Sequence, residues 1–172
     1  FHVVRLVGDK VTQCRQRLQQ ETLGRRGRKN DPLYQARRLL LTRNKLLSET
    51  AAPKVDAILQ DPQYEALTRI WSLYQAVIAA YESPNRTKGR NKLASIIDAL
   101  GAINTKGFPE LRSLARTLRN RRDDILAYFT HPHSSNGPTE AINGRLEHLR
   151  GIALGFRNLQ NYIHRSLLHT GG

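Results

Sequence analysis

Apolar residues recur along this chain at intervals of three and four positions, which is the period of an α-helix. Alternation at two, which would indicate a half-buried strand, is almost absent. The first apolar stripe comprises Val4, Val7, Val11, Cys14 and Leu18. It predicts a helix that ends near Leu23 and Gly24. Because β-branched residues crowd the opening FHVVRLV, a short buried strand remains an alternative for that stretch.

Two acid-proline pairs mark helix starts, because an Asp caps the free backbone N–H groups and proline suits the first helical position. Asp31 with Pro32 predicts a helix from about 32 to 49, stopped by Pro53. Its buried residues would be Leu39, Leu40, Leu46 and Leu47. After a short helix with Val55, Ile58 and Leu59, Asp61 with Pro62 repeats the signal.

The helix that follows Asp61 has the clearest apolar face of the chain. That face comprises Tyr64, Leu67, Ile70, Trp71, Tyr74, Val77, Ile78 and Tyr81. Its aromatic residues would suit base stacking, but stripes at helical spacing are far more often core, and we expect core here.

The second half of the chain continues the helical pattern. After a break at 83–85 we expect a helix to about Ile103, a loop over 104–109, and a long helix from Leu111 to Phe129 with arginines on its outer side. The stretch 130–139 has the composition of a loop, and helices should follow over about 138–150 and 157–169. The fold class is therefore mainly α, with seven or eight helices and little or no strand.

Charge narrows the range of partners. The 172 residues include 28 Lys and Arg against 14 Asp and Glu, a net charge of +14. Such a field attracts polyanions, of which nucleic acid is the foremost candidate.

No apolar run is long enough for a membrane span, and the single Cys14 excludes an internal disulfide. The chain begins at Phe1 within an apolar run and has no Met, so we expect it to be a piece of a longer protein.

The segment 134–158 is the most informative for chemistry. Pro138 suits a first helical position, which places Glu140 in the first turn of a helix, where an acid is favoured as an ordinary cap. Asn143 and Gly144 are poor helix formers and together cost about 1 to 1.5 kcal/mol relative to Ala. A role other than helix stability should keep them, and Gly144 would let a phosphate backbone approach closely.

Both ends of the chain resemble a known family. The C-terminal segment contains Asn136-Gly137-x-x-Glu140-x-x-Asn143, followed by Arg145, Arg150 and Gly155-Phe156-Arg157-Asn158. This pattern resembles the C-terminal end of DDE transposases of bacterial insertion sequences, in the group often called ISL-three. The opening Phe1-His2-Val3-Val4-Arg5-Leu6 is similar to the stretch that follows the second catalytic aspartate of that family.

The resemblance implies a ribonuclease-H-like catalytic core, interrupted by a helical insertion, in which two Asp and one Glu hold two divalent ions for phosphodiester chemistry. It makes Glu140 the third carboxylate and metal ligand, while both aspartates would lie upstream of Phe1. The ion would be Mg²⁺ or Mn²⁺ in the intact parent, and we expect this fragment alone to hold none and to be inactive. It further implies that segment 1–24 belongs to the core, 25–130 is the basic insertion, and 131–172 carries the catalytic glutamate.

DNA contacts are expected from basic and amide side chains in several segments. The candidates are Asn136, Asn143, Arg145, Arg150, Arg157, Arg119, Arg122, Arg37 and Arg38. We expect mostly phosphate contacts to duplex DNA, at transposon ends and at the target. The arginines after Glu140 would instead pair with Glu147 and Glu110 if their role is structural.

Other functional interpretations remain open. The chain would alternatively be a non-catalytic basic helical DNA-binding or regulatory module in which Glu140 only caps its helix, or a helical RNA-associated protein. Its expected location is the bacterial cytoplasm. His131 and His133 suggest a metal site, but without further ligands at suitable spacing a solvated pair is favoured. If the helix of Glu140 lacks its usual cover, a homodimer formed by helix exchange would provide one.

Overall fold

A computed structural model describes residues 2–25, 27–130, 137–153 and 158–170, with the side chains of 137–140 and of 169–170 excepted. Every regular element among these residues is a helix, which confirms the mainly α fold class. The N-terminal part has α1 (Val3–Leu23), α2 (Pro32–Gln35), the 3₁₀ turns η1 (Leu39–Leu41) and η2 (Asn44–Leu46), α3 (Ala52–Gln60), η3 (Pro62–Tyr64), α4 (Glu65–Tyr81), α5 (Arg86–Ala102), α6 (Pro109–Asn120) and α7 (Arg122–Thr130). The C-terminal part has α8 (Gly137–Ile152) and α9 (Leu159–Thr170).

The chain divides into two compact units, residues 1–131 and 132–172. The functional division into 1–24, 25–130 and 131–172 stays a prediction. Within the described residues, no helix combines the length and the apolar character that a membrane crossing requires.

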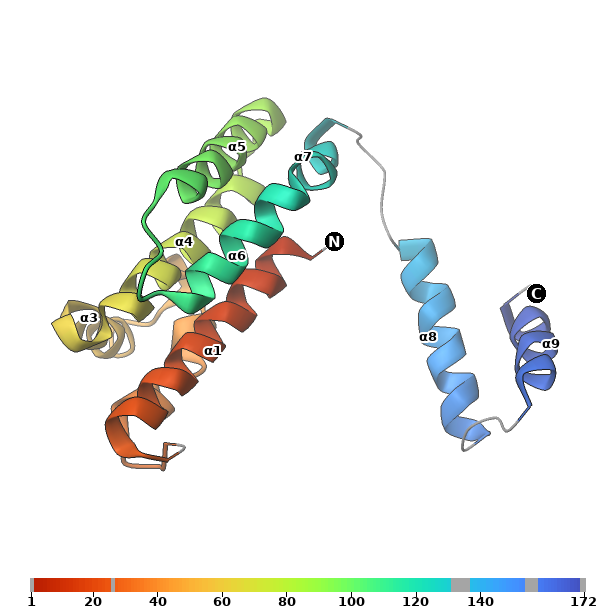
Figure 1. The fold of residues 1–172 in the computed structure, drawn as a ribbon, viewed down its shortest axis with the longest axis horizontal. Coiled ribbons are helices and arrows are strands. Elements are labelled where there is room, and N and C mark those ends of the chain that lie inside the picture. The colour runs from red at the N-terminus through yellow and green to blue at the C-terminus, as the bar shows by residue number, and fades with distance from the viewer. Residues whose placement is uncertain (1, 26, 131–136, 154–157, 171–172) are drawn as a thin grey trace. The chain divides into compact units, whose positions relative to one another are not determined.

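The first unit is a helical bundle in which α1 packs along α4 and α6, and α5 packs against α4, α6 and α7 (Figure 1). The opening residues are helical from Val3, so the strand alternative for FHVVRLV is wrong. Val7, Val11 and Cys14 of the predicted stripe are almost fully buried. The helix ends at Gly24, whose backbone is left-handed with φ of 63° and whose N–H donates to the Gln20 carbonyl, as a C-terminal glycine favours.

Helix α4 buries the face that the spacing predicts. Leu67, Ile70, Trp71, Tyr74, Val77 and Ile78 are buried, which confirms a core role for most of the aromatic stripe. Both acid-proline signals also act as expected: the Asp31 carboxylate accepts from Leu33 N at 2.9 Å, and that of Asp61 accepts from Gln63 N at 3.0 Å.

The helix predicted over 32–49 is wrong beyond its first turn. After α2 the backbone forms η1 and η2, joined through the extended Thr42 and Arg43. Side chains of α4 satisfy this irregular backbone: Tyr74 Oη donates to the Leu41 carbonyl, and Gln75 bonds both the Thr42 carbonyl and Asn44 N. Of the leucines expected inside, Leu40 is buried, Leu39 and Leu47 are half-buried, and Leu46 is 63% exposed. Pro53 lies in the first turn of α3 and so begins a helix rather than stopping one.

The long helix predicted from Leu111 to Phe129 is interrupted at Arg121, whose φ of −110° and ψ of 18° lie outside the helical region. The interruption creates α7, and Asp123 and Asp124 then occupy its first turn, where the helix dipole favours acids. Nine α-helices therefore occur among the described residues, one more than the seven or eight that the sequence predicts, and the division of this long helix accounts for the additional one.

In the second unit α8 and α9 pack against each other. Taken by itself, this helix pair leaves several large apolar side chains exposed. Ile142, Ile152, Leu159, Ile163, Leu167 and Leu168 are between 39 and 82% exposed. Two helices of this length cannot enclose an apolar core of their own.

Candidate nucleic-acid interface

Position 140 lies in the first turn of α8, because that helix begins at Gly137. The side chain of Glu140 lies outside the described residues. On the following turn Asn143 is exposed, and a Cβ atom at Gly144 would meet no described atom within 4 Å apart from the neighbouring backbone of its own helix. The surface of α8 is thus open one turn after Glu140, as close approach of a ligand backbone would require.

The arginines after Glu140 have different surroundings. Arg145 is exposed. Arg150 Nη1 donates to Glu147 Oε1 at 2.8 Å, and its guanidinium lies 5.2 Å from the centre of the Tyr162 ring on α9. Contact with Tyr162 and then with Glu147 raises the pKa of Arg150. Asn136 and Arg157, the other candidates near Glu140, lie outside the described residues, as do His131 and His133.

Arg37 and Arg38 lie between α2 and η1. The Arg37 guanidinium stacks 4.3 Å from the centre of the Tyr34 ring and donates to the Tyr34 carbonyl at 2.9 Å. These contacts hold Arg37 half-buried against its own segment, whereas Arg38 is exposed.

Arg119 and Arg122 lie close together in the chain but contact different groups. Arg122 forms two hydrogen bonds of 3.2 Å to the Asp98 carboxylate on α5, and these raise its pKa. Arg119, on α6, donates from Nη2 to the Gly101 carbonyl at 3.1 Å. A Cβ atom at Gly101 would lie 2.7 Å from that nitrogen, so the approach uses the absence of a side chain there.

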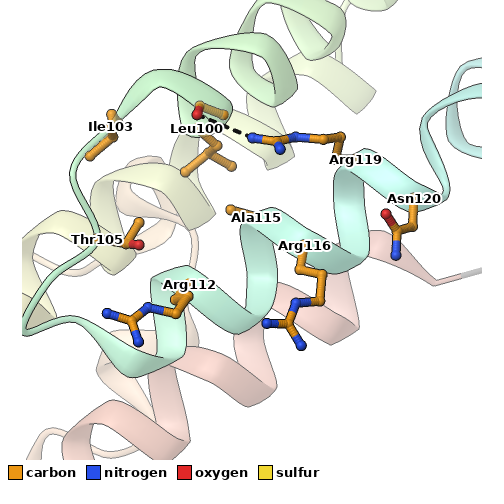
Figure 2. Close-up of a pocket in the computed structure, with 9 residues that line it drawn as sticks. Leu100, Ile103, Thr105, Arg112, Ala115, Arg116, Arg119 and Asn120 are labelled. Atoms are coloured by element: carbon orange, nitrogen blue, oxygen red, sulfur yellow. Dashed lines mark hydrogen bonds between the residues drawn. The ribbon is translucent and has the colours of Figure 1, made fainter.

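Arg119 is one of three arginines at a pocket of about 220 Å³ between the end of α5 and the outer face of α6 (Figure 2). Arg112 and Arg116 are the others, and both are exposed. The remaining lining is Leu100, Gly101, Ile103, Thr105, Ala115 and Asn120. The sequence places Arg112 and Arg116 among the arginines on the outer side of this helix, but they were not among the predicted DNA contacts. Their spacing of four and three residues from 112 to 119 is the signal that would have identified the stripe.

An ion pair fixes α6 beneath this stripe. Arg17 of α1 bonds Glu110 through Nε to Oε1 at 2.8 Å and Nη2 to Oε2 at 3.0 Å. Glu110 is only 9% exposed. The arginines after Glu140 were alternatively expected to pair with Glu147 and Glu110. Arg150 does pair with Glu147, whereas Glu110 pairs with Arg17 instead.

The described residues do not form a complete metal site. Nowhere in that part of the chain do three His, Cys, Asp or Glu side chains gather. A carboxylate such as that of Glu140 has the hard oxygen donors that Mg²⁺ and Mn²⁺ accept, but it supplies one ligand group.

Comparison with known proteins identifies the family. A sequence model of the ISL3 group of DDE enzymes, described as a transposase, matches residues 1–166. Neither the curated proteins nor the solved structures include a match. The match covers both the opening stretch and the segment around Glu140, so this chain belongs to the ISL3 family of DDE transposases.

Proposed function

We propose that this chain is part of a DNA transposase that cleaves and joins DNA strands at the ends of an insertion sequence in the bacterial cytoplasm. The observation that carries the proposal is the family match over residues 1–166. The position of residue 140 in the first turn of α8 supports it further.

In this proposal Glu140 supplies one carboxylate to the divalent ions of the intact transposase, which would be Mg²⁺ or Mn²⁺. Two such ions activate the attacking oxygen and stabilise the leaving oxygen of a phosphodiester. The remaining carboxylates belong to the two aspartates that the family resemblance places before Phe1. By itself the chain binds DNA and does not cleave it, since one carboxylate cannot position two ions.

The role of the first unit is to hold DNA. The charge of the chain supports this role, because its net charge of +14 attracts a phosphate backbone irrespective of base sequence, and residues 1–131 hold 24 of its 28 Lys and Arg against 12 of its 14 Asp and Glu. Arg38, Arg119 and Arg122 are its candidate contacts, and Asn143 and Arg145 are those near Glu140. The exposed apolar residues of α8 and α9 also favour a homodimer.

The test is Mg²⁺-dependent strand cleavage of terminal-repeat DNA by the intact transposase, comparing wild type with Glu140→Gln. Glu147→Gln, seven residues further along α8 and exposed, is the matched control. Loss of cleavage in Glu140→Gln alone supports the proposal. Undiminished cleavage by Glu140→Gln would refute the assignment and favour a helical module in which Glu140 is only a cap, with a loss of about 0.5 to 1 kcal/mol of stability.

A further inference from the structure

Most of the described arginines for which contacts are known are held by an acid or a carbonyl. Arg17, Arg43, Arg69, Arg121, Arg122 and Arg150 form ion pairs. Arg112 and Arg116 take part in none of the ion pairs among the described residues. Other exposed cations share that property, but Arg112 and Arg116 also line the pocket between α5 and α6.

The fold directs these two side chains outward together. Helix α6 buries Leu111, Leu114, Ala115 and Leu118 against the bundle. At about 100° per residue, positions 112, 116 and 119 fall within roughly 60° of one another, on a side of the helix about 120° away from the centre of that buried face. The Glu110 ion pair with Arg17 fixes the start of α6. Arg112, Arg116 and Arg119 follow one another along this helix (Figure 2).

The pocket suits a compact anion. Its described lining contains three guanidinium groups, the Thr105 hydroxyl and the Asn120 amide, and no carboxylate. A volume of about 220 Å³ exceeds the roughly 30 Å³ that one water occupies in the liquid, which leaves space for a phosphate group with some of its hydration. Guanidinium forks match two phosphate oxygens at once, which a lysine ammonium cannot do.

We propose that this pocket binds a phosphate of a DNA backbone, with Arg112 and Arg116 donating to its oxygens and Arg119, held on the Gly101 carbonyl, forming one wall. The inference rests on the proposed function, because it takes DNA as the polyanion. It adds a binding site on the first unit that involves neither Glu140 nor the helix that carries it.

The test measures how the affinity of the 172-residue chain for a duplex depends on salt, by fluorescence anisotropy. Each phosphate contact contributes about 0.9 to the slope of log K against log salt. The double variant R112Q/R116Q should lower the slope by about 1 to 2, equally for unrelated duplex sequences. R43Q/R69Q removes two arginines that are ion-paired with Glu82 and Glu65, and is the charge-matched control.

The outcomes separate this inference from the proposed function. A slope that falls no further in R112Q/R116Q than in R43Q/R69Q, with DNA still bound, overturns the pocket and leaves the transposase proposal intact. R112K/R116K keeps the charge, so it should retain most of the slope but bind at least several-fold more weakly. Lysine variants with unchanged affinity would contradict recognition by guanidinium forks. Binding of structured RNA above duplex DNA at matched salt would contradict both proposals.

Discussion

Removal of the Glu110 carboxylate tests how firmly α6 is held on α1. Breaking a fully buried ion pair costs about 3 to 5 kcal/mol, because the remaining charge is buried without its partner. Here the Glu110 side chain is 10% exposed but that of Arg17 is 26% exposed, and Arg17 keeps a second partner in Glu21 at 3.0 Å. We therefore expect Glu110→Ala to lower the free energy of unfolding by about 2 to 3 kcal/mol.

The double variant R17M/E110L separates lost charge from lost packing. Replacing both partners with apolar groups is often neutral, so this variant should recover most of the loss, with a coupling energy of about 1.5 to 3 kcal/mol. Urea unfolding followed by circular dichroism gives these values when the transition is single. The control is Glu65→Ala, which breaks the exposed pair with Arg69 and should cost under about 1 kcal/mol.

Two results would show that the Arg17–Glu110 pair does not hold α6 in place. One is a loss below about 0.5 kcal/mol in Glu110→Ala, which would mean that the pair is worth no more than a surface pair. The other is a double variant as unstable as Glu110→Ala, which would assign the cost to packing.

Three further predictions concern stability and assembly. Gly89→Ala should lower the free energy of unfolding in urea by about 1 to 2 kcal/mol despite the better helix propensity of alanine, because its Cβ would lie 2.6 Å from the Ala80 carbonyl oxygen. Gly144→Ala, whose Cβ would lie in open space, should raise the free energy of unfolding. Burial, followed by the Glu110 charge, raises the pKa of Cys14 to about 12, so a thiol reagent at pH 8 should modify this thiol only when the chain unfolds, and rapid labelling of the folded chain would contradict this. The stability that the protonated Cys14 thiol contributes should be lost as the pH rises from about 8.5 toward 12. Light scattering should give a dimer mass at micromolar concentration, and a monomer mass would contradict the homodimer.

Local patterns were sufficient for the parts of the fold that the sequence of a single helix encodes. The stripe of α1, the buried face of α4 and the caps at Asp31 and Asp61 are of this kind. They depend on helical periodicity and on short-range hydrogen bonds, which can be recognised without knowing the tertiary fold.

The remaining features depend on distant contacts. The segment after α2 leaves the helical path where Tyr74 and Gln75 of α4 supply its hydrogen bonds, and no local pattern encodes partners more than 30 residues away. The pair of Arg17 with Glu110 spans 93 residues. The pocket arginines were recognisable as a stripe, but the wall that α5 contributes was not. The catalytic role of Glu140 stays a prediction from family resemblance.

The proposed role of Glu140 as a metal ligand in the intact transposase is tested by the affinity for Mn²⁺, measured by electron paramagnetic resonance in wild type, Glu140→Gln and Glu147→Gln. We expect weaker Mn²⁺ binding in Glu140→Gln and unchanged binding in Glu147→Gln, because only the former loses an oxygen ligand. Equal Mn²⁺ affinity in all three proteins would show that Glu140 is no metal ligand and leave it as a helix cap.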